Sequence, residues 1–166
     1  MLIALGHKSR VGKDTAADTI GDITEGTIHR LSFAKPLYEI VQGIQRILNV
    51  ELKKDGTLMQ RVGTILRTHY GPDVFVRILA GIIDEKLAAN PDCHIIVTDV
   101  RLENEFDMLK SKNFTMIKID RSDRPIDRDP NHISETALDN AIFDHVIEND
   151  GTIESFREKI VELLKK

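Results

Sequence analysis

The sequence predicts an α/β fold in which a parallel sheet of about five strands is covered by helices on both faces. Short apolar runs alternate with segments whose apolar residues recur every three or four positions, which is typical of alternating strands and helices. The run His94–Thr98 is continuously apolar at its centre, as expected of a strand buried on both faces. The length of 166 residues, with 41% hydrophobic and 30% charged residues, suits a single domain over residues 1–166.

The chain is predicted to open with two strand–helix units. Leu2–Leu5 is a short apolar run that Gly6 stops, and Asp14–Ile20 follows as a helix. Ile28–Phe33 is the second predicted strand, and Pro36 suits the first turn of the next helix. The apolar residues of that helix share one face: Leu37, Ile40, Val41, Ile44, Ile47 and Leu48.

Two further helices precede the third strand. Thr57–Tyr70 has apolar residues at helical spacing, and Gly71-Pro72 separates it from the next helix. In that helix apolar residues recur from Val74 to Leu87, and Asn90-Pro91 marks its end.

The last part of the chain continues the alternation. The strand His94–Thr98 leads to Asp99, and a helix from about Glu103 to Lys112 precedes a strand at Thr115–Ile119. The polar stretch Arg121–Asn131 is predicted to be a mobile loop or lid. We then expect a helix over Ser134–Ile142, a strand over His145–Ile147, a turn at Asn149–Gly151 and a closing helix striped by Ile153, Phe156, Ile160, Leu163 and Leu164.

Charge and composition exclude several classes of protein. The net charge is −4, and residues 99–150 carry seven Lys and Arg against thirteen Asp and Glu, so we expect no partner that is a nucleic-acid polymer. No run of 18 apolar residues exists, and Met1–Leu5 is too short for a signal peptide, so we expect no membrane partner. The single Cys93 suits a reducing cytoplasm, and the spacing of the six histidines predicts no zinc site.

The loop Gly6–Thr15 resembles a phosphate-binding P-loop. It lies between a predicted strand and a predicted helix, where backbone N–H groups and the helix N-terminus attract phosphate and a lysine reaches the terminal phosphates. Five residues separate Gly6 from Gly12 where four are usual, and Asp14 replaces the usual Ser or Thr. An ordinary β–α turn with scattered glycines is the alternative.

Several motifs together resemble the deoxynucleoside monophosphate kinases of tailed bacteriophages over nearly the whole chain. They are Gly12-Lys13-Asp14-Thr15, Ser32-Phe33-Ala34-Lys35-Pro36-Leu37, Gln60-Arg61-Val62-Gly63-Thr64, Thr98-Asp99-Val100-Arg101-Leu102-Glu103-Asn104-Glu105 and His132-Ile133-Ser134-Glu135. The resemblance implies an adenylate-kinase-like P-loop kinase with a monophosphate-binding region at about residues 33–70 and a lid at about 121–132. It also implies the host cytoplasm as the compartment and allows a homodimer.

The donor side of the implied site centres on the loop. Lys13 would bind the phosphates of ATP together with the loop residues and one lid arginine: Ser9, Arg10, Val11, Gly12, Asp14, Thr15 and Arg121. Mg²⁺ is the implied cofactor, held by Asp14, Thr15 and Asp99, in part through water. An N-cap role for Asp99 is the alternative, and the two roles are compatible.

The acceptor side draws on three parts of the chain. The guanidinium of Arg101 suits phosphate oxygens, with a salt bridge to Glu105 as the alternative. Gln60, Thr64 and Arg67 share one helical face, which could bind the monophosphate. A helix face that is simply exposed to solvent is the alternative. The resemblance adds Glu105, Lys35 and Phe33 to the residues that would bind the acceptor. For Phe33, core packing is the alternative.

Three arginines of the candidate lid complete the predicted site. Arg121, Arg124 and Arg128 fall within eight residues, which fits closure over phosphates. The acidic residues among them allow a salt-bridged loop instead. The resemblance names Lys13, Arg101, Arg121 and Arg128 as catalytic.

The predicted activity is transfer of the γ-phosphate of ATP to a deoxynucleoside monophosphate, so small-molecule nucleotides are the expected partners. Two alternatives remain open from the sequence. One is a kinase resembling phosphomevalonate kinase, which shares a Gly-Lys-Asp sequence after its loop. The other is a nucleotide-binding regulator without turnover.

Overall fold

The computed structural model describes residues 1–53, 55–123, 125 and 129–165. Five parallel strands form one sheet in the order β2-β3-β1-β4-β5. The strands are β1 (Leu2–Gly6), β2 (Ile28–Leu31), β3 (His94–Val100), β4 (Thr115–Asp120) and β5 (His145–Glu148). The predicted α/β class, the parallel sheet and its strand number are confirmed, and the architecture is consistent with a P-loop kinase.

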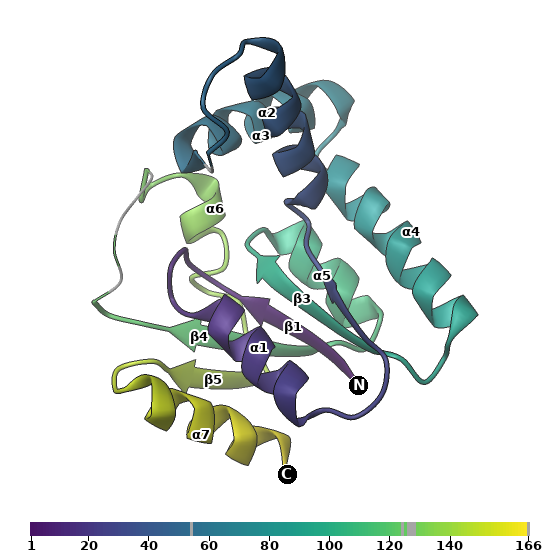
Figure 1. Cartoon of the computed structure of the whole chain (residues 1–166), viewed down its shortest axis with the longest axis vertical. Coiled ribbons are helices and arrows are strands. Elements are labelled where there is room, and N and C mark those ends of the chain that lie inside the picture. The colour runs from purple at the N-terminus through teal and green to yellow at the C-terminus, as the bar shows by residue number, and fades with distance from the viewer. Residues whose placement is uncertain (54, 124, 126–128, 166) are drawn as a thin grey trace.

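Within the described part of the chain, seven helices connect and cover the strands (Figure 1). They are α1 (Lys13–Ile23), α2 (Lys35–Ile47), α3 (Gly56–Tyr70), α4 (Val74–Ala89), α5 (Glu103–Ser111), α6 (Ile133–Thr136) and α7 (Ile153–Leu164). Within the described residues, no helix is long and apolar enough to span a bilayer.

The helices bury both faces of the sheet because alternate residues of each strand point to opposite sides. On β1, Ile3 and Leu5 pack with Ile20 of α1 and Phe156 of α7. Ala4, between them in sequence, belongs to the cluster on the opposite face. That cluster contains Leu79 and Ile83 of α4 together with Phe106 and Leu109 of α5.

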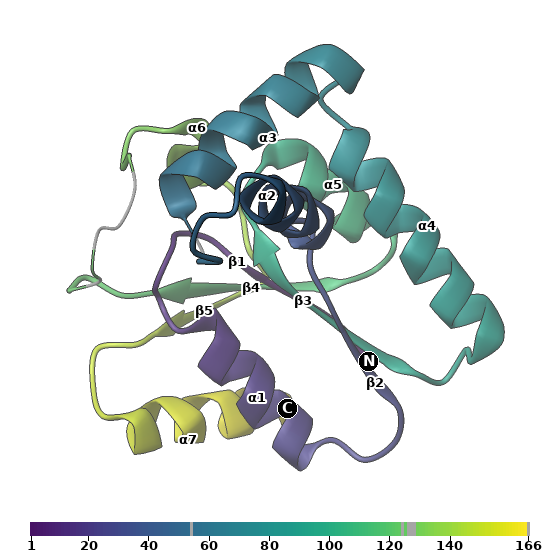
Figure 2. The ribbon, with the colours of Figure 1, turned by 45° about the horizontal axis from the view of Figure 1, so that its top comes forward.

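A third apolar cluster lies apart from the sheet and joins α2, α3 and the start of α4. Leu37, Val41, Met59 and Phe75 form its buried part. The two views show α2 and α3 together at one end of the molecule, with the short α6 beside α3 (Figure 1 and Figure 2). The region predicted to bind the monophosphate therefore has a small core of its own.

Two predicted elements end earlier than the sequence indicates. The strand predicted over Ile28–Phe33 ends at Leu31, because Asp99 accepts hydrogen bonds from the next three residues. The helix predicted over Ser134–Ile142 is wrong beyond Thr136. Its continuation is replaced by turn bonds such as Asp139 N to Thr136 O at 3.0 Å, while Leu138 is buried in the core.

Candidate active site

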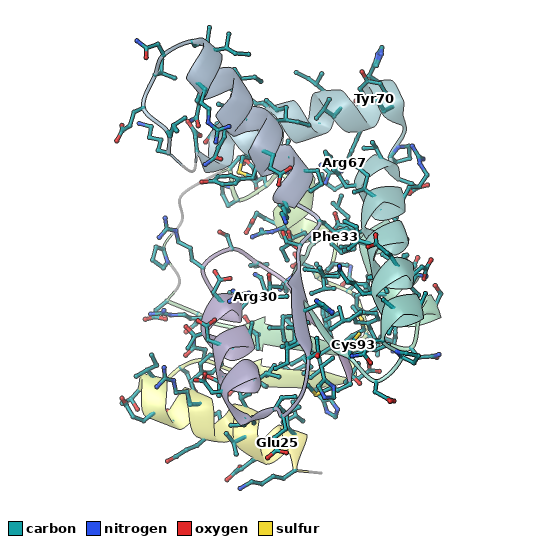
Figure 3. The ribbon with its side chains drawn as sticks, turned by 45° about the vertical axis from the view of Figure 1, so that its right-hand side comes forward. Glu25, Arg30, Phe33, Arg67, Tyr70 and Cys93 are labelled. Carbon is teal, nitrogen blue, oxygen red and sulfur yellow. The ribbon has the colours of Figure 1, made fainter. Side chains whose placement is uncertain are left out.

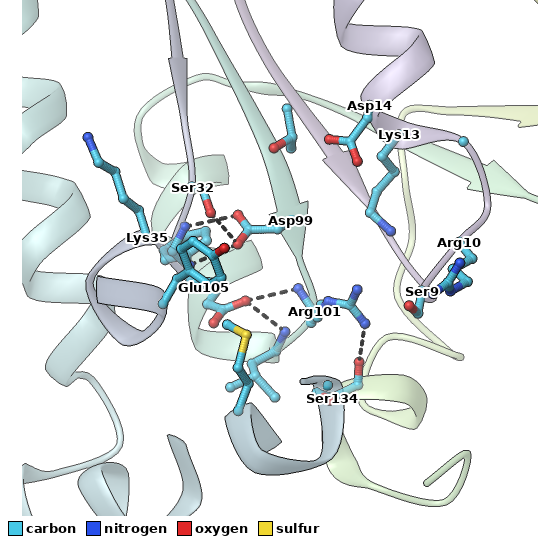
Figure 4. Close-up of a pocket in the computed structure, with 18 of the residues that line it drawn as sticks. Ser9, Arg10, Lys13, Asp14, Ser32, Lys35, Asp99, Arg101, Glu105 and Ser134 are labelled. Atoms are coloured by element: carbon cyan, nitrogen blue, oxygen red, sulfur yellow. Dashed lines mark hydrogen bonds between the residues drawn. The ribbon is translucent and has the colours of Figure 1, made fainter. Parts of the chain in front are cut away.

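One open cleft of about 1220 Å³ contains most of the predicted site residues. The β1–α1 loop, the β2–α2 junction, α3 and the end of β3 supply its walls, so it lies where parallel sheets usually bind ligands (Figure 4). The predicted residues that line it are Ser9, Arg10, Gly12, Lys13, Asp14, Thr15, Phe33, Lys35, Gln60, Arg67, Asp99, Arg101, Glu105 and Arg121. Of the other predicted residues, Val11 is buried, Thr64 lies on the exposed side of α3, and Arg128 lies outside the described residues.

The β1–α1 loop ends at Gly12, where both the backbone conformation and a close neighbour disfavour any side chain. Gly12 has φ +104° and precedes the first residue of α1. A Cβ at this position would lie 2.6 Å from Nδ2 of Asn149, which donates a 2.9 Å hydrogen bond to the carbonyl of Val11. The close approach of Asn149 therefore requires glycine here.

Replacing Gly12 by alanine is expected to weaken ATP binding by at least about tenfold, because the loop must shift to relieve both the backbone strain and the clash. Gly21→Ala is the matched control in the same helix, since its added Cβ would meet nothing within 4 Å. That control should keep ATP affinity and gain about 0.5–1 kcal/mol of stability. Calorimetric titration and urea unfolding measure the two quantities, and equal ATP affinity in both variants would contradict the role of the glycine.

Lys13 is a nearly buried cation at the start of α1. Its side chain points into the cleft (Figure 4) and donates to the carbonyls of Lys8 and, at 3.5 Å, His7. The residue is 7% exposed. Burial, and secondly the nearby Arg101, lower the pKa of Lys13 from 10.5 to about 7. An ammonium in this environment lacks full charge compensation, so a bound anion would stabilise its charged form.

The carboxylate of Asp14 is paired with Arg30 of β2. Arg30 also donates to Asp18 at 2.6 Å, so one guanidinium links two carboxylates of α1. Figure 3 labels Arg30 beside α1. The side chain of Asp14 is nevertheless 83% exposed. It lines the cleft next to Thr15, and both are oxygen ligands of the kind that Mg²⁺ prefers. The described residues hold no cluster of three His, Cys, Asp or Glu side chains that could bind a metal by itself.

Asp99 fixes the junction between β2 and α2. Its Oδ2 accepts from the Ser32 hydroxyl at 2.7 Å and from the Ala34 amide at 2.8 Å, while Oδ1 accepts from the Phe33 amide at 2.9 Å. The carboxylate thus caps the first turn of α2 from another strand. The predicted alternative, in which Asp99 is itself a helix N-cap residue, is wrong, because the N-cap residue of the following helix α5 is Leu102. Asp99 instead accepts hydrogen bonds at the start of α2.

Arg101 is paired with Glu135 rather than Glu105. Its guanidinium donates to Oε1 of Glu135 and, at 3.5 Å, to the carbonyl of Ser134. Glu105 instead accepts from the Arg101 backbone amide at 2.9 Å. The predicted alternative of an Arg101–Glu105 salt bridge is therefore wrong, because Glu105 turns toward the start of its own helix.

Glu105 is a buried carboxylate that faces Arg67 of α3. Its Oε1 lies 3.5 Å from the Arg67 guanidinium, and Oε2 accepts from the amides of Arg101 and Leu102. Burial, and secondly the negative Asp99, raise the pKa of Glu105 to about 7. Arg67 also stacks over Phe75, 4.9 Å from the ring centroid. This pair ties α3 to the first turn of α5, and both residues line the cleft.

The predicted polar face of α3 contacts the last residue of the candidate lid and the start of α6. Gln60 donates to the Ser134 hydroxyl at 3.4 Å, and the Thr64 hydroxyl lies 3.3 Å from Nε2 of His132. Gln60 lines the cleft and Thr64 does not. The face is thus occupied by protein contacts and is not simply solvated.

Phe33 and Arg121 both border the cleft, but each also has a structural contact of its own. Phe33 is 3% exposed and packs in the core beside α4, so core packing is its main role here, although it borders the cleft. Arg121 lines the cleft and pairs with Asp123 at 2.7 Å, as the alternative of a salt-bridged loop predicts. Arg124 and Arg128 lie outside the described residues.

Sequence reasoning assigned no role to three residues that shape this site. Glu135 bonds to Arg101, Asn149 bonds to the β1–α1 loop, and Arg30 bonds to Asp14. Glu135 belongs to the motif His132-Ile133-Ser134-Glu135, through which the resemblance could have found it, and Asn149 opens the predicted turn at Asn149–Gly151. Their partners are 34 and 138 residues away in the chain, so no local spacing indicates the contacts.

Two comparisons with known proteins identify the family of the chain. A family model described as "Deoxynucleotide monophosphate kinase" matches residues 56–160, more than half of the chain. A protein of Acanthamoeba polyphaga mimivirus with the name "Putative deoxynucleotide monophosphate kinase" is 28% identical over 186 aligned positions. That alignment covers 97% of this chain and 94% of the relative, and therefore includes the β1–α1 loop. The chain belongs to the deoxynucleotide monophosphate kinase family.

Proposed function

We propose that this protein transfers the γ-phosphate of ATP to a deoxynucleoside monophosphate, which gives the diphosphate and ADP. The observation that carries the proposal is the pairing of two cations, Lys13 and Arg101, in one cleft at the carboxyl edge of the sheet. They are close enough that Arg101 lowers the pKa of Lys13. Lys13 would hold the phosphates of ATP and Arg101 would hold the phosphate of the acceptor, so the two reacting groups would be brought together in the cleft.

The chemistry of the acceptor explains why the cleft needs no general base. A phosphate monoester has a second pKa of about 6, so near neutral pH its oxygen is already a competent nucleophile. The protein's task is then to align the two phosphates and to neutralise the charge that develops during transfer. Cations and amide groups would supply this, and the cations Lys13, Arg101 and Arg121 are among the residues that line the cleft.

Each side of the cleft would hold one substrate. On the donor side, Lys13 and the amides of the β1–α1 loop would bind the phosphates of ATP. On the acceptor side, Arg101 would bind the monophosphate, with Arg67, Gln60 and Lys35 around it. Arg121, which follows β4 and lines the cleft, would bind the transferring phosphate once it leaves Asp123.

On the donor side, the phosphates of the nucleotide would supply most of the ligands of Mg²⁺, and the protein would supply fewer. When bound it would neutralise charge on the phosphates. Asp14 and Thr15 would hold it at the start of α1, and Asp99, whose oxygens already accept three hydrogen bonds, would contact it through water. Two protein groups with phosphates and water satisfy the usual coordination of this ion.

A coupled assay of ADP release tests the proposal. The protein should form ADP only when a deoxynucleoside monophosphate is added, and the panel should include all four bases, the corresponding ribonucleotides and mevalonate 5-phosphate. Membership of the family does not favour the phosphomevalonate-kinase-like or regulator alternatives. ATP binding without ADP release for any nucleotide, or turnover of mevalonate phosphate alone, would refute the proposed function.

Binding of ATP is expected to take up close to one proton at pH 8. Lys13, with a pKa of about 7, is mostly neutral at this pH, and the phosphates would raise its pKa toward its ordinary value. Calorimetric titration in two buffers with different ionisation enthalpies measures the uptake. The Lys13→Met variant should show none. Equal heats in both buffers for the unmodified protein would contradict phosphate binding at Lys13.

A further inference from the structure

Glu135 is a buried carboxylate that joins two parts of the cleft. Its side chain is 1% exposed. Its Oε2 accepts a 3.0 Å hydrogen bond from the backbone amide of Ser9 in the β1–α1 loop, and its Oε1 accepts from the guanidinium of Arg101. Ser9 lies 126 residues away in the chain and Arg101 lies 34 away. One carboxylate therefore touches both the donor side and the acceptor side.

The cost of burying this charge makes its partners important. A buried carboxylate is tolerated only when cations and hydrogen bonds compensate it. Arg101 supplies the compensating cation and Ser9 supplies a donor, while the positive charge of Lys13 also interacts with Glu135. Because Glu135 is the carboxylate that Arg101 pairs with, a shift of Glu135 would leave the guanidinium with only the 3.5 Å bond to the Ser134 carbonyl among the contacts described above, and would change its direction.

Asp139 offers a natural comparison within the same segment. It lies 2.8 Å from Nε2 of His7 and 3.0 Å from Nζ of Lys8, so it also holds the β1–α1 loop. No contact of Asp139 with Arg101 occurs in the part of the chain that the structure describes. Its side chain is 42% exposed. Glu135 thus differs from Asp139 in its link to the acceptor side.

We propose that Glu135 is a positioning residue that couples the donor loop to Arg101, so that the two halves of the cleft are held in one arrangement. The inference rests on the proposed function, since it treats Arg101 as the acceptor's guanidinium. Glu135 itself touches neither substrate in this account. It acts by fixing the direction of Arg101 relative to the loop that binds ATP.

A double-mutant cycle tests the coupling. Glu135→Gln keeps the shape and still accepts from the Ser9 amide, but it loses the charge that orients Arg101. We expect kcat/KM for the acceptor to fall by about 10- to 100-fold, the loss typical of a hydrogen bond between charged groups. ATP affinity should change much less. In an Arg101→Ala background, the same substitution should cause no further loss, because its target is gone.

Three variants serve as controls for the cycle. Glu135→Asp retains the charge one methylene short and should recover part of the lost activity. Asp139→Asn should weaken ATP binding and add its effect independently to that of Arg101→Ala. Glu158→Gln makes the same chemical change at an exposed position of α7 and should leave kinetics and stability unchanged.

A second readout does not depend on turnover. Hydrogen exchange of the Ser9 amide, followed by NMR, should accelerate at least about tenfold in Arg101→Ala, because Glu135 loses the ion pair that helps to hold its carboxylate in place. In Glu135→Ala the amide should exchange fast whether or not Arg101 is present. If the unmodified protein releases no ADP with any deoxynucleoside monophosphate, the proposed function fails, and this measurement still decides the coupling.

Two results would overturn the inference while leaving the proposed function intact. One is a kinetic cycle in which Glu135→Gln and Arg101→Ala are additive, as expected for a purely structural glutamate. The other is Ser9 exchange that is insensitive to Arg101. Thermal unfolding of every variant shows whether it is folded, and the double variant removes both members of the ion pair together, so no buried carboxylate is left without its cation.

Discussion

Lys13→Met is expected to lower phosphoryl transfer by about 10²- to 10³-fold or more, the range for losing one group that stabilises transition-state charge in a dry site. The methionine fills a similar volume, so the fold should be retained. Steady-state and single-turnover rates of ADP formation measure the loss. Lys165→Met, at the exposed end of α7, is the matched control and should be fully active.

The same variant should be more stable than the unmodified protein near neutral pH. The folded-state pKa of Lys13 is about 7, below its ordinary value of 10.5, so its charged form destabilises the folded state at and below pH 7. As the pH rises from about 7 to 10.5, the unfolded chain binds more protons, and stability increases. Urea unfolding should show this increase in the unmodified protein and not in Lys13→Met. Near-normal turnover, or identical pH profiles of stability, would contradict the assignment of Lys13.

Arg101→Lys is expected to reduce kcat/KM for the acceptor by about 100-fold while preserving the fold. Lysine keeps a positive charge opposite the buried Glu135, so the carboxylate stays compensated. It cannot reproduce the flat fork that binds two phosphate oxygens at once. The acceptor panel, assayed at saturating ATP, measures kcat and KM separately.

Arg77→Lys is the control for this substitution. Arg77 is exposed, and its guanidinium donates to the carbonyl of Tyr70, so the same chemical change there should leave kcat and KM unaltered. Unchanged kinetics in Arg101→Lys as well would mean that Arg101 serves only to compensate Glu135.

The local parts of this protein follow from its sequence. Periodicity predicts β3 and α4, because a continuous apolar run and a three-to-four repeat are decided within a few residues. The positions of Gly12 and Lys13 in a strand–loop–helix context also predict the loop. Phe33 is less well predicted, since an aromatic residue next to a site and one in a core look alike in sequence.

The contacts that complete the cleft do not follow from the sequence. Glu135 lies four residues after Asn131, where the predicted polar stretch Arg121–Asn131 ends. Nothing in the local spacing of residues indicates that Arg101 is the partner of Glu135. The helix predicted after Ser134 fails for the same reason, because the tertiary contacts of Leu138 and Asp139 outweigh the local helical preference. Long-range pairing is decided by topology, which brings β1 between β3 and β4.

The placement of Asn149 against Val11 has a consequence for how the protein is made. The loop is encoded within the first fifteen residues, yet its wall includes Asn149 and Phe156, and β1 needs both β3 and β4 as neighbours. A ribosome must therefore synthesise most of the chain before the loop can take its final shape. During translation the apolar segment Leu2–Gly6 therefore stays unpaired until β3 and β4 have been synthesised. Nucleotide binding can stabilise the folded loop only after α7 has emerged from the ribosome.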